Sequence, residues 1–215
     1  MLLAVDCGNT NTVFAVFEGD TQRGQWRIAT DPRRTADEYA VWLTQLMSLT
    51  GLKVDDISYA IVTTVVPGTR RNLDGLLESH FGVTPLVVRD RDVALGIEAL
   101  IDRPEQVGAD RLGAAVGAHI KHPGDLIVID FGTGTTFDLV DDAGNFRGGV
   151  IAPGINLSVE ALYMAGALLP RVNIEKPDKV IGGATVPAMQ SGIFWGYVSM
   201  IEGMVPRIAK EYGKP

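Results

Sequence analysis

The alternation of apolar and polar residues predicts the same short structure at two places in the chain. Residues 2–5 and residues 126–129 are apolar runs of strand type, and each is followed by a polar, glycine-containing segment. A second run rich in β-forming residues comes next, over 13–19 in the first case and over 137–144 in the second. The pattern therefore predicts one β-hairpin made twice, with its copies 124 positions apart.

The rest of the pattern predicts strands and helices that would cover both hairpins. Thr35 and Glu38 have the spacing of a capping box, which predicts a helix that ends at Gly51. Further strands are predicted over 25–29, 59–66 and 85–88, and further helices over 69–79, 155–167 and 186–211. Strands that alternate with helices indicate an α/β protein with mixed sheets.

The turns of the two hairpins carry the same kinds of residue. The first reads Asp6, Cys7, Gly8, Asn9, Thr10, Asn11 and Thr12, and the second reads Asp130, Phe131, Gly132, Thr133, Gly134, Thr135 and Thr136. Glycine allows the backbone to approach a ligand closely or to take a positive φ, and backbone N–H groups and threonine hydroxyls can hold phosphate oxygens. The carboxylates of Asp6 and Asp130 suit the hard cations that accompany phosphates. The alternative is an ordinary turn whose side chains satisfy only its own backbone.

The duplication predicts two related domains that face one another across a cleft. We place them at residues 1–117 and 118–215. The first unit takes 124 residues from one hairpin to the next, whereas 90 residues remain from residue 126 onward. We therefore expect the second domain to be shortened at its C-terminus, without its last strand–helix–strand portion.

Composition narrows the choice of partners and compartment. The net charge is −7, which argues against binding to nucleic acid or to an anionic membrane surface. Cys7 is the only cysteine, so no intrachain disulfide can form, and we expect it to be a packing residue in a reducing compartment. The sequence has no apolar run long enough to span a bilayer and no basic leader, so we expect a cytoplasmic protein.

A third polar motif opens a predicted helix. Gly108, Ala109, Asp110 and Arg111 come directly before an apolar pattern of helical spacing. Asp110 then lies in the first turn, where it could accept a proton from an attacking hydroxyl, and Arg111 could bind a carboxylate or phosphate. The alternative is an aspartate that only offsets the helix dipole beside an arginine in a surface ion pair.

The sequence allows two roles for each of two glycine-rich segments. Residues 148–154 hold three glycines and a proline between a strand and a helix, as in a loop that closes over a ligand or makes a tight crossover. Gly192, Gly196 and Gly203 lie in the last predicted helix and allow close packing, either within the subunit or against a partner. The sequence has no P-loop, no dinucleotide-binding fingerprint and no nucleophile elbow, which removes the commonest alternatives for a nucleotide enzyme.

Four motifs taken together resemble type III pantothenate kinase, a bacterial family of coenzyme A synthesis. They are Asp6-x-Gly8-Asn9-Thr10-x-Thr12, Gly108-Ala109-Asp110-Arg111, Asp130-Phe131-Gly132-Thr133 and Gly148-Gly149-x-Ile151-x-Pro153-Gly154. Their order and spacing along the whole chain match the family. The resemblance implies two tandem RNase H-like domains of the actin, Hsp70 and sugar-kinase type, with mixed sheets.

The resemblance also implies the reaction and the residues that serve it. It implies ATP-dependent phosphorylation of pantothenate to 4'-phosphopantothenate, with Mg²⁺ and a monovalent cation, K⁺ or NH₄⁺, in a homodimer. ATP would be bound by Asp6, Cys7, Gly8, Asn9, Thr10, Asn11, Thr12, Val13 and Thr133. Pantothenate would be bound by Gly108, Ala109, Asp110, Arg111 and Thr185, with Asp110 as the catalytic base. Asp6 would serve magnesium, directly or through water, and Asp130 the monovalent cation.

Two other functions fit the same motifs. One is a non-catalytic, nucleotide-binding regulator derived from such a kinase, which the shortened second domain would favour. The other is a kinase or phosphatase of the same fold that acts on another small molecule, such as a sugar. Binding without turnover would select the first, and phosphorylation of a hexose but not of pantothenate would select the second.

Overall fold

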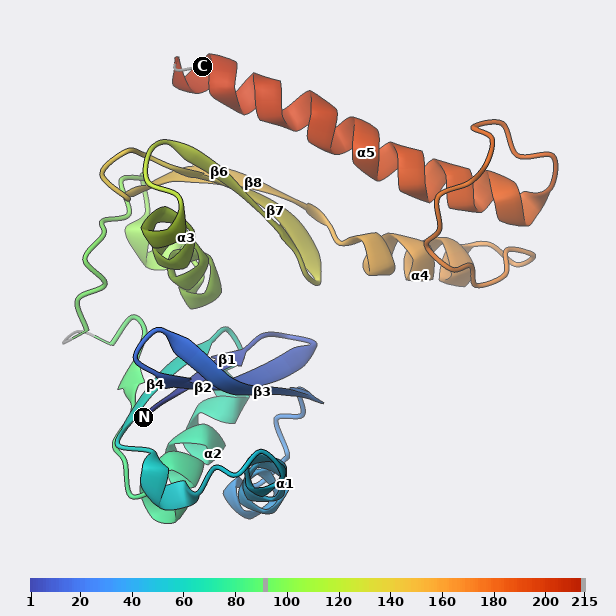
Figure 1. The fold of residues 1–215 in the computed structure, drawn as a ribbon. Coiled ribbons are helices and arrows are strands. Elements are labelled where there is room, and N and C mark those ends of the chain that lie inside the picture. The colour runs from blue at the N-terminus through green and yellow to red at the C-terminus, as the bar shows by residue number, and fades with distance from the viewer. Residues whose placement is uncertain (91–92, 214–215) are drawn as a thin grey trace. The chain divides into compact units, whose positions relative to one another are not determined.

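The computed structural model describes residues 1–90 and 93–213, and the chain divides into two compact units. The first comprises Met1–Glu98 and Asp102–Gly117, and the second Ala99–Ile101 and Ala118–Pro215. The short segment Ala99–Ile101 belongs with the second unit because Leu100 N–H donates to the Phe146 carbonyl at 2.8 Å. Figure 1 shows the elements of both units.

The first unit is built on a five-stranded mixed sheet in the order β3-β2-β1-β4-β5. Its strands are β1 (Leu2–Cys7), β2 (Asn11–Glu18), β3 (Thr21–Ala29), β4 (Tyr59–Thr64) and β5 (Leu86–Val87). The first three form an antiparallel meander, whereas β1, β4 and β5 are parallel. The C-terminal ends of β1 and β4 therefore lie side by side at the same end of the sheet.

Helices cover one face of this sheet and form the core with it (Figure 1). They are α1 (Ala36–Leu49), α2 (Arg70–Gly75) and the π-helical turn η3 (Leu76–His80), with single 3₁₀ turns at Val54–Asp56, Pro67–Thr69 and Pro104–Gln106. The predicted capping box of α1 is confirmed, since Thr35 N–H donates to Glu38 Oε2 at 2.8 Å and Glu38 N–H donates to Thr35 Oγ1 at 3.3 Å.

The alternation of side chains along β1 separates the core from the site. Leu3, Val5 and Cys7 are buried against the helices together with Tyr39 and Leu43. Since neighbouring side chains of a strand point to opposite faces, the residues between them point to the other face. The hydrophobic core thus fixes β1 so that its last polar residue faces away from α1 and α2.

The second unit contains a three-stranded antiparallel sheet in the order β6-β7-β8, which repeats the meander of the first unit. Its strands are β6 (Leu126–Phe131), β7 (Gly134–Val140) and β8 (Phe146–Pro153), and its helices are α4 (Ile155–Ala165) and α5 (Thr185–Tyr212). Helix α3 (Ala109–Lys121) begins in the first unit and ends in the second. The hairpins predicted from the sequence are both present.

One expectation of local structure was wrong, and one of two alternatives for the turn glycines is excluded. Residues 148–154 do not form a loop, because β8 extends through Pro153 and only Gly154 separates it from α4. Neither Gly8 nor Gly132 has a positive φ, so these glycines do not serve the turns through left-handed backbone. Among the described residues, no helix is both long and apolar enough to cross a bilayer.

Candidate active site

The turn of the first hairpin is closed by its own backbone and by the end of β3. Gly8 N–H donates to the Asn11 carbonyl at 3.0 Å. Thr30, just beyond β3, donates its N–H to the Thr10 carbonyl at 2.9 Å and its hydroxyl to the Gly8 carbonyl at 2.7 Å. The side chains of Asn9, Thr10 and Asn11 are exposed, so the turn presents polar groups to solvent on a fixed backbone.

Two residues of the same motif face the core instead. Cys7 is fully buried, its sulfur lies 3.2 Å from Thr69 Oγ1, and it accepts a hydrogen bond from Thr12 Oγ1 at 3.3 Å. Thr12 is also fully buried and lies 2.9 Å from the Thr30 hydroxyl. The expectation that Cys7 is a packing residue is confirmed. Both residues can reach a bound nucleotide only through their backbone.

Asp6 lies at the end of β1 on the face opposite the helices. Its carboxylate is exposed, and Oδ1 accepts a hydrogen bond from Thr63 Oγ1 at 2.6 Å. Thr63 is the direct neighbour of Asp6 in the parallel pairing of β1 with β4. A hydroxyl bonded to a carboxylate at this length is a charge-assisted hydrogen bond, which fixes the orientation of the carboxylate.

The third motif lies at the same edge of the first unit. Gly108 precedes α3, and Asp110 lies exposed in the first turn of that helix, as predicted, with Oδ1 accepting from Arg111 N–H at 2.8 Å. A Cβ at Gly108 would overlap with Asp110 Oδ1 and would lie 3.6 Å from Val65 Cγ1. Val65 N–H donates to the Cys7 carbonyl at 3.2 Å. The fold therefore brings the start of α3 to the ends of β4 and β1.

One ion pair and one hydrogen bond to a backbone carbonyl hold the segment that leads from β5 toward this helix. Arg70 of α2 donates to both carboxylate oxygens of Asp90, at 3.2 and 2.9 Å, and also to Asp74 at 2.7 Å. The hydrogen bonds from Arg70 hold the pKa of the Asp90 carboxyl below its ordinary value. Arg89, with a left-handed φ of 81°, donates to the Glu105 carbonyl. The contact with Arg70 ties the start of this segment to α2, and the contact of Arg89 with Glu105 joins the two ends of the segment to each other.

The second hairpin has a tighter turn than the first. Gly132 N–H donates to the Gly134 carbonyl at 2.9 Å, whereas the first hairpin closes between residues three apart. Asp130 and Thr133 are exposed at this turn. Gly154 donates its N–H to the Thr133 carbonyl at 3.0 Å, and a Cβ at Gly154 would overlap with the Gly132 and Thr133 backbone. Only glycine allows the start of α4 to approach the turn this closely.

The different turn lengths change which threonines correspond. At the constant sequence offset of 124, Thr12 corresponds to Thr136 and Cys7 corresponds to Phe131. In the strand pairing, however, Cys7 is opposite Thr12, whereas Phe131 is opposite Thr135. Thr135 is fully buried, as Thr12 is, and its hydroxyl has no hydrogen-bond partner among the described residues. The equivalence read from the sequence therefore holds for aspartate and glycine but is wrong for the last threonine.

The remaining predicted substrate contact lies in the second unit. Thr185 is the first residue of α5 and is exposed. Asp6 and the Gly108–Arg111 motif belong to the first unit, and Asp130, Thr133 and Thr185 belong to the second. The structure thus brings together the first and third motifs within one unit, and the turn at Thr133 with the start of α4 within the other.

The protein side chains at the two turns suit a cation that is held mainly by phosphate oxygens and water. No group of three or more His, Cys, Asp or Glu side chains that could hold a metal ion occurs among residues 1–90 and 93–213. Asp6 and Asp130 instead offer single exposed carboxylates beside turns rich in N–H and hydroxyl groups. Magnesium typically uses one or two carboxylates together with phosphate oxygens and water. The residues present fit that mode of binding.

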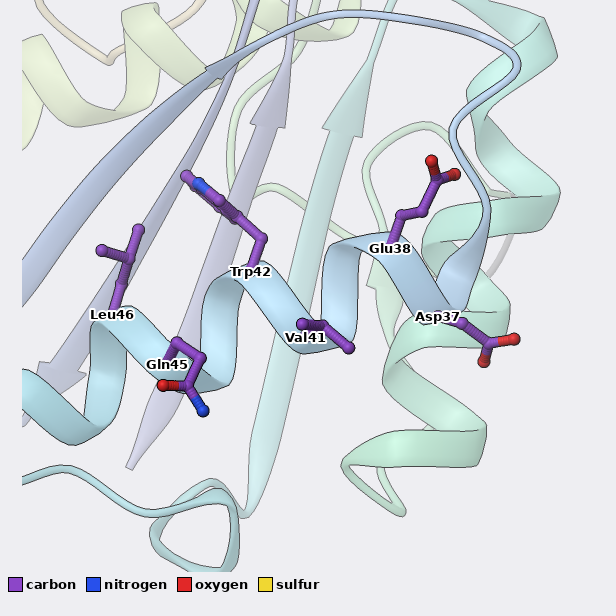
Figure 2. Close-up of a pocket in the computed structure, with 6 residues that line it drawn as sticks. All are labelled: Asp37, Glu38, Val41, Trp42, Gln45 and Leu46. Carbon is purple, nitrogen blue, oxygen red and sulfur yellow. The ribbon is translucent and has the colours of Figure 1, made fainter.

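A separate hollow lies on α1 and contains none of the predicted site residues. It is lined by Asp37, Glu38, Val41, Trp42, Gln45 and Leu46 (Figure 2). Because α1 packs on the core face of the first sheet, this hollow and the Asp6 carboxylate belong to opposite faces. We therefore do not assign the hollow to the candidate active site.

Sequence reasoning missed the residues that orient the predicted ones. Thr63 bonds to Asp6 and Thr30 bonds to the first turn, yet they lie 57 and 22 residues from their partners. Thr63 belongs to a strand whose apolar pattern gives no sign of a polar role. Thr63 can be identified only when the parallel register of β4 with β1 is known.

Two mixed α/β units, each with an aspartate-bearing hairpin, define the actin, Hsp70 and sugar-kinase fold class, and this prediction from sequence is confirmed. The model of the type III pantothenate kinase family matches residues 2–207, and the chain belongs to that family. A Campylobacter jejuni protein described as a Baf family transcriptional activator has a similar structure, with a TM-score of 0.55 and 17% identity over 94% of this chain and 78% of that one. The ethanolamine utilization protein EutJ from Carboxydothermus hydrogenoformans gives a TM-score of 0.52 and 14% identity over 98% of this chain and 71% of that one. At such identities these likenesses concern the fold alone.

Relatives of known name are much more similar in sequence. The type III pantothenate kinase of Paramagnetospirillum magneticum is 62% identical over 99% of this chain and 82% of its own length. That of Rhodospirillum rubrum is 60% identical over 100% of this chain and 84% of its own length. The resemblance inferred from four motifs is thereby confirmed over the whole chain.

Proposed function

We propose that this chain transfers the γ-phosphoryl group of ATP to the primary hydroxyl of pantothenate, forming 4'-phosphopantothenate in the first step of coenzyme A biosynthesis. The observation that carries this proposal is the position of Asp110. It lies at the start of α3 beside the ends of β4 and β1, at the edge where Asp6 is held by Thr63. A base and a cation-binding carboxylate at one edge are what phosphoryl transfer to an alcohol requires.

Both hairpin turns bind the phosphates of ATP in this proposal. Asn9, Thr10 and Asn11 are exposed and can contribute side chains, whereas the buried Cys7 and Thr12 contribute backbone groups. Gly8 and Val13 complete the first contact surface, and Thr133 adds a phosphate contact from the second unit. Asp6 binds Mg²⁺, directly or through water, and Asp130 binds the monovalent cation, K⁺ or NH₄⁺. Bound Mg²⁺ would neutralise charge on the phosphates.

Asp110 acts as the general base. It accepts the proton of the pantothenate hydroxyl while the hydroxyl oxygen attacks the γ-phosphorus, and the bond to the β–γ bridging oxygen breaks to release ADP. Arg111 binds the carboxylate of pantothenate, to which a guanidinium can donate two parallel hydrogen bonds. Gly108 and Ala109 line the pocket through their backbone, and Thr185 adds a hydroxyl from the start of α5.

Replacement of the base tests the assignment directly. Asp110→Asn should lower kcat by a factor on the order of 10² to 10⁴ in a coupled ADP-release assay, because the amide cannot accept the proton. Asp102→Asn, an exposed aspartate before the motif, is the matched control and should keep normal turnover. Calorimetry with ATP and with pantothenate should show that Asp110→Asn still binds both. Near-normal turnover of Asp110→Asn would exclude the role, and binding without turnover in the unmodified chain would favour the non-catalytic regulator.

The same proposal includes a homodimer formed through α5. Gly192 and Gly196 are exposed, and a Cβ at either would meet no heavy atom within 4 Å. They line a shallow groove with Val180 and Ile181, whose side chains are 66% and 87% exposed. Small residues beside exposed apolar ones are typical of a surface that another subunit covers. The buried lone thiol, Cys7, supports a cytoplasmic location for this enzyme.

Sedimentation can test the dimer without reference to activity. Gly196→Arg should convert a dimer to a monomer, since it places a long charged side chain on the groove while its Cβ would meet no heavy atom within 4 Å among the described residues. Glu202→Arg, on the same helix and also exposed, is the control and should remain dimeric. A monomeric wild-type chain at micromolar concentration would contradict this part of the proposal.

A further inference from the structure

A chain of hydrogen bonds in the second unit connects α5 to the turn at Thr133. Tyr197 of α5 donates its hydroxyl to the Pro153 carbonyl at 2.7 Å. Its oxygen lies 2.7 Å from Ser158 Oγ of α4, and Ser158 is the donor of this bond because the tyrosine proton is already used. Helices α4 and α5 lie side by side within the second unit (Figure 1).

The peptide group between Pro153 and Gly154 links these contacts to the turn. Its carbonyl accepts from Tyr197, and its N–H donates to the Thr133 carbonyl at 3.0 Å. Hydrogen bonds that share one peptide group polarise one another and strengthen together. The Gly154 carbonyl also accepts from Ser158 N–H at 2.9 Å, so Ser158 holds the same residue from the helix side.

The backbone of Gly154 packs directly against the turn. A Cβ at Gly154 would overlap with the carbonyl oxygens of Gly132 and Thr133, and the Gly154 N–H bonds to the Thr133 carbonyl, so the position of Gly154 is coupled to that of the turn. In the first unit the corresponding residue, Thr30, bonds to its turn with its own side chain. Gly154 has no side chain to do so, and the contact from α5 supplies the missing support.

We infer that Tyr197 is a positioning residue for the nucleotide, which acts through the Pro153–Gly154 peptide to hold Thr133 in place. The inference rests on the proposed phosphate contact of Thr133. A net hydrogen bond contributes about 0.5–1.5 kcal/mol, which corresponds to about a two- to tenfold change in an equilibrium constant. Tyr197→Phe removes the hydroxyl and keeps the ring. It should therefore raise the KM for ATP about two- to tenfold, with the KM for pantothenate unchanged.

The matched control lies on the same helix. Tyr212 donates its hydroxyl at 2.9 Å to Oδ1 of Asp125, which lies directly before β6 and at the end of that strand away from the turn. Tyr212→Phe loses a bond of the same kind and should keep the wild-type KM for ATP. Ser158→Ala, which removes only the second contact of Tyr197, should give a smaller change in the same direction.

Hydrogen exchange provides a readout that does not depend on activity. The amide of Gly154 should exchange about two- to tenfold faster in Tyr197→Phe than in wild type or Tyr212→Phe, because its peptide group is less firmly held. Equal exchange in the two tyrosine variants, or an equal KM for ATP, would overturn the inference while leaving the kinase proposal intact. An unchanged KM for ATP in Thr133→Val would show instead that the proposed phosphate contact is wrong, and the positioning role would fall with it.

Discussion

The hydroxyl of Thr63 should control how well Asp6 serves the nucleotide and its cation. Thr63→Val replaces the hydroxyl by a methyl group of similar size, on a strand that favours β-branched residues. The remaining methyl can keep its place near α3, since a Cβ added at Gly113 would lie 3.6 Å from Thr63 Cγ2. The variant therefore removes one hydrogen bond and little else.

The size of the effect follows from the kind of bond that is lost. The Thr63 Oγ1 to Asp6 Oδ1 distance is 2.6 Å, and a hydrogen bond to a charged group contributes about 1.5–3 kcal/mol. Since the Asp6 carboxylate is exposed, water replaces part of the lost contact, and the lower end applies. About 1.5 kcal/mol corresponds to about a tenfold loss in kcat/KM for ATP.

The assay is the ATP dependence of ADP release at saturating pantothenate, repeated over a range of Mg²⁺ concentrations. Thr63→Val should also require more Mg²⁺ for half-maximal rate, because the carboxylate that binds the cation is less well oriented. Thr63→Ser keeps the hydroxyl and should restore most of the loss. The reasoning is refuted if Thr63→Val matches wild type in both dependences, or if Thr63→Ser is as impaired as Thr63→Val.

Two further pairs of substitutions test the close approach at Gly108 and the buried hydrogen bonds of Thr12. Gly108→Ala should lower kcat about tenfold, because its Cβ would displace the flexible Asp110 carboxylate, while the urea midpoint stays near wild type. Gly113→Ala, in the helix that follows, is the control and should keep normal kcat. Equal kcat in both variants would contradict the role of close approach at Gly108. Thr12→Val should lower the free energy of unfolding by about 1–3 kcal/mol, because it breaks buried hydrogen bonds. Thr135→Val loses no hydrogen bond among the described residues and should change the free energy of unfolding by less than about 0.5 kcal/mol. Urea unfolding of the two valine variants measures the difference, and equal losses would show that the hydrogen bonds of Thr12 do not contribute the extra stability.

Local patterns were sufficient to predict the elements that carry the site. Both hairpins, the capping box at Thr35 and the helix at Asp110 depend on residues within a few positions of one another. Apolar periodicity and cap chemistry act over that range, which is why they can be read along the chain. The candidate residues themselves were predicted from motifs, and their roles stay predictions until the variants are measured.

Features that depend on pairing between distant segments could not be predicted in this way. The parallel register of β4 with β1 places Thr63 beside Asp6, and no local signal announces it. Glycine and proline are rare in strands, so the composition of residues 148–154 predicts a loop. In the structure Gly154 is required by the close approach of the backbone at Thr133, a contact that exists only once β7 and β8 have paired.

The two hairpins hold corresponding turns by different means, and this difference explains why the Thr135 hydroxyl has no hydrogen-bond partner within residues 1–90 and 93–213. Thr30 follows β3 as Gly154 follows β8, and each donates its N–H to the turn of its own hairpin. In the first unit the Thr30 side chain also bonds to Thr12, whereas glycine at position 154 leaves Thr135 without that partner. The second turn is one residue shorter, so its carbonyl groups occupy the space that a side chain would need. A tighter turn at Thr133 thus requires glycine beside it, and glycine in turn requires support from elsewhere in the unit, which the contact from Tyr197 can provide.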